Sequence, residues 1–199
     1  MKFALIGDSH AQVIFPNLQK LLENDGHEVV LSKPKAGWTI EKHIDNGLEL
    51  EMTNSDPDIV LYSLGGNNRD LDTNSYKKKI KKGIDIAKKS GAKKILWVSP
   101  FYSFDQEVED RHRWTHLYLK NKSPILGIEY INLRETSKDG HTSDNVHFKN
   151  EKYREMANLI YNKIPKFVIL PLTLQPYKPL IYLGCAFLFF KFINKGDKK

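Results

Sequence analysis

One serine stands where a nucleophile could be presented to a substrate. The apolar run "KFALIG" ends abruptly in Asp8, Ser9 and His10. A buried strand that stops here would present Ser9 at the edge of a sheet, with an acid before it and a histidine after it. A serine hydroxyl becomes nucleophilic when a base takes its proton, a second group orients that base, and donors stabilise the oxyanion. Ser9 is therefore a candidate nucleophile.

The segment "DNVHF" supplies candidates for the base and for the group that orients it. Asp144 and His147 lie three residues apart, just before the last helical pattern of the folded part. This spacing suits a turn in which the carboxylate reaches the imidazole of its own segment. Asp144 would then hold the tautomer while His147 faces Ser9. His141 in the same loop is a second candidate base.

Three donors are available for an oxyanion: the backbone N–H groups of Ser9 and Gly37, and the side-chain amide of Asn67. Such donors are typically worth about 3–4 kcal/mol each in the transition state. Each residue also has a structural interpretation, because Asp and Ser cap helices, Gly and Asn form turns, and His147 could be a surface histidine. Their common order along one expected sheet edge favours the catalytic interpretation.

The elements that must position these residues alternate in type along the chain. Short β-rich apolar runs occur at 2–7, 28–33, 58–64, 93–99 and 128–133. Helical spacing occurs at 13–24, 40–52, 75–90, 107–121 and 150–164. This alternation predicts an α/β protein with a five-stranded parallel sheet covered on both faces. We expect a three-layer, doubly wound, flavodoxin-like fold with strand order 2-1-3-4-5.

In such a fold, ligands bind beyond the carboxyl ends of the strands. The loops that follow the five strands are "GDSHAQ", "KPKAGWT", "GGNNRD", "SPFYSFD" and "RETSKDGHTSDNVHFKN". They collect Gly, Asn, Ser, His and Asp, although these residues are scattered in the sequence. The fold therefore predicts that the candidate residues converge at one edge of the sheet.

Four motifs in this order resemble those of the SGNH/GDSL hydrolase superfamily over about residues 1–165. They are Gly7-Asp8-Ser9, Gly37, Gly65-Gly66-Asn67 and Asp144 with His147. The family contains serine esterases, lipases, acetylesterases and some acyltransferases. The resemblance implies that Ser9 is the nucleophile, His147 the base and Asp144 its partner. It also implies that Gly37 and Asn67, with Ser9, form the oxyanion hole.

Two positions depart from the usual family pattern. Asn68 follows Asn67 where the family usually has Asp, and His10 follows the serine where Leu is frequent. The sequence "GDSHA" is similar to the SGNH modules attached to polysaccharide O-acyltransferases, which points towards acetylated sugars. We expect His10, Phe101 and Tyr102 to contact the substrate. Trp114 is a further aromatic in the same region, where most side chains are expected to pack against the sheet.

The composition limits the other classes of function. The 199 residues are 40% hydrophobic and 28% charged, which is typical of a folded protein. The single Cys185 excludes an intramolecular disulfide, and the seven histidines lack the spacing of a metal site. The expected chemistry needs no metal ion or cofactor. The net charge is +7, with +5 after residue 165 and +2 before it, which argues against a nucleic-acid partner.

Residues 166–199 form a separate basic and apolar tail after the expected domain of 1–165. Pro165 precedes it, prolines at 171, 176 and 179 interrupt it, and 180–193 are apolar except for Lys191. Fourteen helical residues reach about 21 Å, against a hydrocarbon core of about 30 Å. We expect 180–193 to attach to a membrane in preference to a protein partner. The first residues do not resemble a signal peptide, so the expected location is membrane-associated through the tail, or cytoplasmic.

The function favoured by the sequence is a serine esterase that removes short acyl groups, in particular O-acetyl groups, from carbohydrate. An acyl-enzyme on Ser9 would be hydrolysed by water that His147 activates. One alternative is an O-acyltransferase, in which a sugar replaces that water. The other is a non-catalytic structural or binding protein that keeps the fold, for example in a membrane-associated or viral assembly.

Overall fold

A five-stranded parallel sheet forms the centre of the structure. The computed structural model describes residues 1–67 and 73–165. The strand order is β2-β1-β3-β4-β5, and all neighbouring strands are parallel, which confirms the predicted fold class and order. The strands are β1 (Lys2–Gly7), β2 (Glu28–Pro34), β3 (Ile59–Ser63), β4 (Lys94–Val98) and β5 (Glu129–Ile131).

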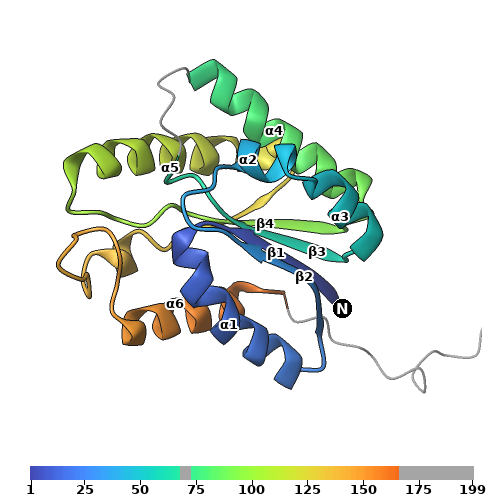
Figure 1. Cartoon of the computed structure of the whole chain (residues 1–199), viewed down its shortest axis with the longest axis horizontal. Coiled ribbons are helices and arrows are strands. Elements are labelled where there is room, and N and C mark those ends of the chain that lie inside the picture. Colours follow the sequence, from blue (N-terminus) through green and yellow to red (C-terminus); the bar gives the residue numbers. More distant parts are fainter. Residues whose placement is uncertain (68–72, 166–199) are drawn as a thin grey trace, which may run out of the picture. The chain divides into compact units, whose positions relative to one another are not determined.

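Helices cover both faces of the sheet, because alternate strand residues face opposite sides. Phe3 and Leu5 of β1 belong to the core beneath α1 and α6, whereas Ala4 and Ile6 belong to the core beneath α2 to α5. Figure 1 shows these two layers on opposite sides of the sheet. The helices are α1 (Ser9–Asn24), α2 (Ile40–Asp45), α3 (Leu48–Ser55), α4 (Thr73–Lys89), α5 (Gln106–Leu126) and α6 (Asn150–Lys163).

The helix boundaries differ from the prediction at several places, and α5 continues to Leu126 instead of ending at residue 121. The predicted helix 40–52 is wrong as a single element, because α2 ends at Asp45 and α3 begins at Leu48. Gly47 between them has a φ of 87°, a left-handed conformation that ends a helix and that glycine adopts readily. Helix α1 begins at Ser9 rather than at residue 13, since Asp8 caps it directly after β1.

The register brings the carboxyl ends of the strands to one edge. Gly7 at the end of β1 is level with Pro34 of β2 and Ser63 of β3. Ser63 is level with Val98 of β4, which is level with Ile131 of β5. The five loops that carry the candidate residues therefore start from one line across the sheet.

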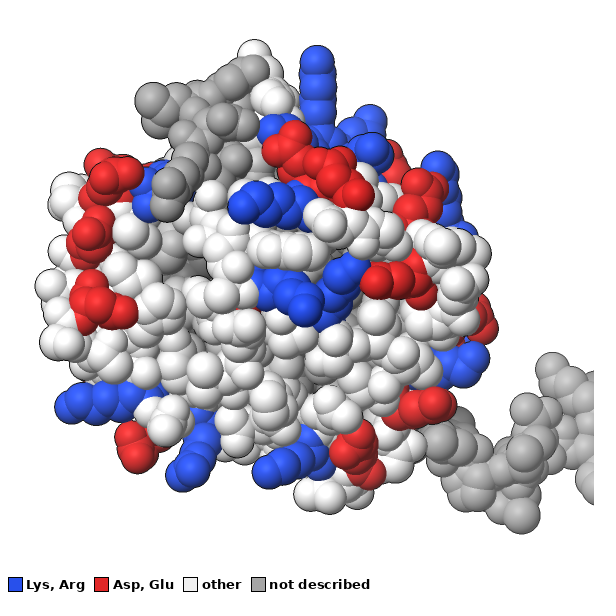
Figure 2. All heavy atoms as spheres, in the orientation of Figure 1, with Lys and Arg blue, Asp and Glu red and all other residues white. Residues whose placement is uncertain are grey.

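The predicted apolar segment 180–193 lies outside the described residues, as does Asn68. Among the described residues, no helix combines the length and the apolar character needed to cross a membrane. Figure 2 shows Lys and Arg side chains interspersed with Asp and Glu on one face of the molecule.

The close approach of β1 and α1 makes Gly7 sensitive to substitution. A Cβ at Gly7 would lie 2.1 Å from the Cβ of Ala11, so the helix or the strand would have to shift. We expect Gly7→Ala to lower the free energy of unfolding by about 1–3 kcal/mol in urea denaturation. The double variant Gly7→Ala/Ala11→Gly should lose less than the sum of the two single effects. Strictly additive effects would show that the two residues are not in contact.

Candidate active site

The immediate transition from β1 to α1 positions Ser9. The N–H of Asp8 still donates to the carbonyl of Ser63 on the neighbouring strand at 3.2 Å. The side-chain carboxyl group of Asp8 then accepts from the N–H of His10 at 3.2 Å and caps α1. Ser9 is therefore the first residue of a helix that starts at the end of the sheet. Its backbone N–H has no acceptor within the helix, as is general for a first turn.

The segment from Gly140 to Lys149 folds back on itself and holds Asp144 and His147. Thr142 N donates to His147 O, and Lys149 N to Gly140 O, both at 2.8 Å. One carboxylate oxygen of Asp144 accepts from Val146 N at 3.0 Å and from His147 N at 2.9 Å. The Thr142 hydroxyl also donates to this oxygen, at 2.8 Å. These bonds explain why a three-residue spacing brings the carboxylate to the imidazole.

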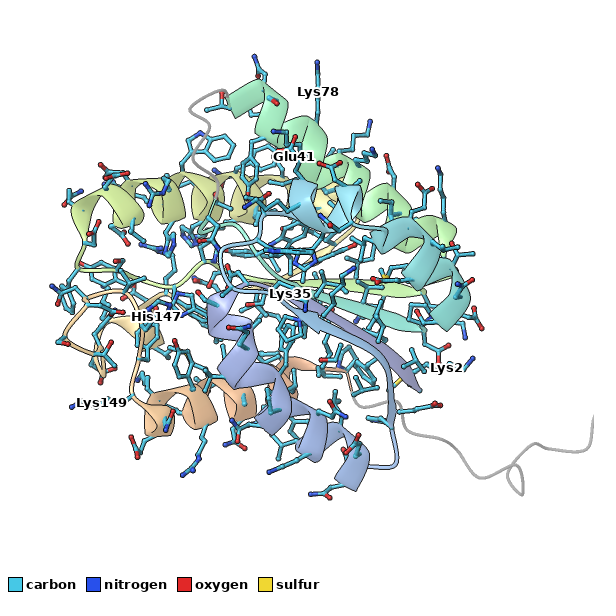
Figure 3. The ribbon with its side chains drawn as sticks, viewed as in Figure 1. Lys2, Lys35, Glu41, Lys78, His147 and Lys149 are labelled. Carbon is cyan, nitrogen blue, oxygen red and sulfur yellow. The ribbon has the colours of Figure 1, made fainter. Side chains whose placement is uncertain are left out.

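Asp144, His147 and Ser9 form one continuous chain of hydrogen bonds. The second carboxylate oxygen of Asp144 lies 2.7 Å from Nδ1 of His147, and Nε2 of His147 lies 3.1 Å from Oγ of Ser9. Desolvation raises the pKa of Asp144, but the hydrogen bonds from His147, Val146 and Thr142 outweigh it and hold the pKa well below its usual value. The carboxylate is thus charged and fixes the proton on Nδ1. Figure 3 shows His147 beyond the strand ends, near the start of α1.

The loop that carries Asp144 and His147 is attached to the segment after β4. The carbonyl of Asn145 accepts from the Ser103 hydroxyl at 3.0 Å and from Phe104 N at 2.9 Å. His141 donates through Nε2 to the carbonyl of Tyr102 at 2.9 Å. His147 rather than His141 therefore faces Ser9, and His141 helps to hold the loop.

The loops that carry Gly37 and Asn67 flank the end of β1 and contact each other. Lys35 N donates to Gly7 O at 2.9 Å, and Gly37 turns the chain with a φ of 69°. The amide of Asn67 donates to the carbonyl of Trp38 at 3.3 Å. An amide group has two N–H bonds, so this contact orients the Asn67 side chain and leaves a second donor.

Helix α5 packs against the loop that carries Asn67, through Thr115 and His112. Thr115 donates to the carbonyl of Gly65 at 3.1 Å. A Cβ at Gly66 would lie 2.4 Å from Nε2 of His112, so only glycine fits against this imidazole. His112 is fixed in turn by a 2.6 Å hydrogen bond from Nδ1 to the carbonyl of Phe101. This contact gives the second glycine of "GGNN" a packing role that sequence reasoning did not identify.

The predicted substrate contacts differ in accessibility. His10 is 5% exposed and Phe101 is 2% exposed, and their rings pack edge to face with centroids 5.0 Å apart. Both side chains are thus largely shielded from solvent, and their contact with a substrate stays a prediction. Tyr102 is partly exposed and remains a candidate contact.

Sequence reasoning did not identify several residues that hydrogen-bond to the loop of Asp144 and His147. Thr142 lies two residues before Asp144, and its hydroxyl could have been recognised as a partner for a turn carboxylate. Ser103 and Tyr153 come from distant segments and have no local signal. Their roles depend on tertiary contacts that only the folded chain reveals.

Asp8 is a buried acid, which makes the stability of the protein depend on pH. Burial raises the pKa of Asp8 to about 7, although hydrogen bonds from the backbone of His10 and Ala11 oppose the shift. The folded chain keeps this proton up to about pH 7, whereas the unfolded chain loses it near pH 4. The contribution of Asp8 to stability therefore decreases as the pH rises through this window.

We expect Asp8→Asn to raise the free energy of unfolding by about 1–3 kcal/mol at pH 8, with the gain disappearing towards pH 4. Asn caps helices as well as Asp does, and a pKa difference of one corresponds to about 1.4 kcal/mol. Urea denaturation at pH 4, 6 and 8 measures the effect. The exposed Asp85→Asn controls for the removal of one negative charge. An equal change at all three pH values would contradict the assignment.

The described architecture matches solved structures of ester-cleaving proteins. A lipase/acylhydrolase from Enterococcus faecalis aligns with a TM-score of 0.66 at 19% identity, over 82% of this chain and 94% of that one. An acetyl xylan esterase aligns with a TM-score of 0.69 at 18% identity, over 83% of this chain and 100% of that one. A GDSL-like lipase from Bacteroides thetaiotaomicron VPI-5482 aligns with a TM-score of 0.67 at 15% identity, over 81% of this chain and 86% of that one.

No protein-family model and no curated protein matches the sequence. The likeness therefore rests on the arrangement of the elements, at sequence identities below 20%. The three alignments each cover more than four fifths of this chain. The chain has the fold of the SGNH/GDSL hydrolases, which confirms at the level of fold the resemblance noted in its motifs.

Proposed function

We propose that the protein is a serine ester hydrolase in which Ser9 is the nucleophile. The observation that carries this proposal is the hydrogen-bonded order of Asp144, His147 and Ser9 at the carboxyl edge of the sheet. A network with a purely structural role would not need a serine at a helix start to face a histidine that is itself oriented by a charged carboxylate. The fold shared with lipases and acetyl xylan esterases supports the same reaction class.

In the first half of the reaction, Oγ of Ser9 attacks the acyl carbon while its proton passes to Nε2 of His147. The carbonyl oxygen becomes an oxyanion, for which the backbone N–H groups of Ser9 and Gly37 and the free N–H of Asn67 are the proposed donors. The tetrahedral intermediate collapses when the C–O bond to the alcohol breaks. The leaving alkoxide takes the proton from His147, and an acyl ester remains on Ser9.

In the second half, water takes the place of the alcohol. His147 removes a proton from the water as it attacks the acyl carbon, and returns that proton to Oγ of Ser9 when the acid leaves. Asp144 stays ionised throughout and stabilises the imidazolium that forms twice in the cycle. The low pKa of Asp144 suits this role, because the carboxylate does not compete for the transferred proton.

The proposed substrate is a short acyl ester, in particular an O-acetyl group on carbohydrate. Several solved structures with this fold are of acetyl xylan esterases, which supports an acetylated sugar as the alcohol part. Tyr102 is a partly exposed aromatic side chain in the loop that follows β4, and it is a candidate sugar contact. Gly37 and Asn67 would hold the carbonyl oxygen whichever alcohol is attached.

Ser9→Ala tests the nucleophile directly in the full-length chain. We expect hydrolysis of p-nitrophenyl acetate to fall by about 10³-fold or more, because no oxygen remains to form the acyl-enzyme. A fluorophosphonate probe should label the wild-type protein and not the variant. Ser143→Ala is the matched control, since Ser143 is an exposed serine in the loop of His147. A folded wild-type protein with neither turnover nor labelling would refute the esterase proposal.

A series of esters tests the substrate class. We expect kcat/KM to fall from p-nitrophenyl acetate through butyrate to octanoate, and acetate to be released from acetylated xylo-oligosaccharide. Adding an unacetylated oligosaccharide distinguishes the acyltransferase, which would form acylated sugar at the expense of free acetate. A preference for octanoate, with no acetate released from sugar, would overturn the carbohydrate assignment.

A further inference from the structure

The buried side of the candidate site contains a second hydrogen-bonded chain. Nδ1 of His10 lies 3.0 Å from the hydroxyl of Tyr153 on α6. The same hydroxyl accepts from the backbone N–H of Phe148 at 3.3 Å. His10 directly follows Ser9, and Phe148 directly follows His147. The chain therefore joins the neighbour of the nucleophile to the neighbour of the base.

Proton positions in this chain follow from its donors and acceptors. An amide N–H can only donate, so the Tyr153 oxygen accepts from Phe148. Among the described residues, Nδ1 of His10 is the available acceptor for the buried hydroxyl proton, which places the proton of this neutral imidazole on Nε2. Burial lowers the pKa of His10 well below its usual value and raises that of Tyr153 to about 12, in agreement with an uncharged pair.

The solvent-exposed contact with Asp144 does not by itself explain how His147 is held towards Ser9. The side chains of His147 and Asp144 are 42% and 51% exposed, so water competes with their interaction. The His10 ring lies on the buried side, with its centroid 5.1 Å from that of His147 and 5.6 Å from that of Phe148. His10 and Tyr153 are both buried, at 5% and 3% exposure, and their contact is shielded from water.

We propose that His10 and Tyr153 form a positioning pair that fixes the distance between Ser9 and His147. This inference rests on the proposed esterase function and deepens it. The pair takes no part in proton transfer, because Nδ1 of His10 is engaged by Tyr153 and the transferred proton moves between Ser9 and His147. Tyr153 holds the backbone of the His147 loop, and His10 holds Tyr153 at a fixed place relative to the start of α1.

The first test is Tyr153→Phe in the full-length chain. The lost hydroxyl leaves Phe148 N–H without its acceptor, so we expect kcat for p-nitrophenyl acetate to fall about tenfold with KM unchanged. Amide hydrogen exchange at Phe148 should accelerate. Tyr161→Phe is the matched control, because it removes a hydroxyl from the same helix at a site where the partner is Asp25. It should leave both kcat and exchange at Phe148 unchanged.

The second test asks whether the two residues act as a unit. Asn can present an oxygen near the place of Nδ1, so His10→Asn should keep most of the activity, whereas His10→Leu should lose about as much as Tyr153→Phe. The double variant His10→Leu/Tyr153→Phe should be no slower than the slower single variant. Additive losses, or an equal loss in His10→Asn and His10→Leu, would overturn the pairing.

The outcomes separate the two proposals. A wild-type protein without turnover refutes the esterase function, and exchange at Phe148 still decides whether Tyr153 holds the loop. An active wild-type protein whose kcat and Phe148 exchange are unaffected by Tyr153→Phe refutes the positioning pair alone. Circular dichroism and the midpoint of thermal unfolding confirm that each variant is folded.

Discussion

The end of β1 is the reference point for the whole candidate site. Gly7 lies level with the ends of β2 and β3, and its carbonyl accepts from Lys35 N and, at 3.1 Å, from Nε2 of His43. The absence of a side chain at Gly7 lets α1 begin directly against the strand. The segment after β2 and the end of β3 both contact this short junction. The groups proposed for nucleophilic attack and for oxyanion binding are therefore held by one rigid segment of backbone.

The sequence was sufficient for the parts of the fold that have a local or periodic signal. Strand runs such as "KFALIG" and "DIVLYSL" are apolar on both faces, which is the pattern of a buried parallel strand. Their alternation with helices indicated a doubly wound sheet, for which 2-1-3-4-5 is a common strand order. The break between α2 and α3 was missed because "NGLELEM" keeps an apolar spacing that continues a helix. Only the left-handed conformation of Gly47 shows that the axis changes there.

In the candidate site, too, the contact within one turn was predictable from the sequence, and the packing of His10 and Tyr153 was not. The contact of Asp144 with His147 was predictable because it forms within one short turn. The burial of His10 was not predictable, since a histidine in a first helical turn can face solvent or core, and the choice depends on where α6 packs. The same holds for Tyr153, whose hydroxyl meets residues 143 positions earlier and five positions earlier in the chain.

The contact between Ser9 and His147 spans 138 positions of the sequence. Helix α1 carries Ser9 and helix α6 follows His147, and the two helices pack against each other on one face of the sheet. During synthesis, the serine leaves the ribosome long before the histidine exists, and domains fold as their segments become available. Ser9 therefore stays without its contact to His147 until α6 has docked, so the proposed reactive serine would be completed only at the end of folding.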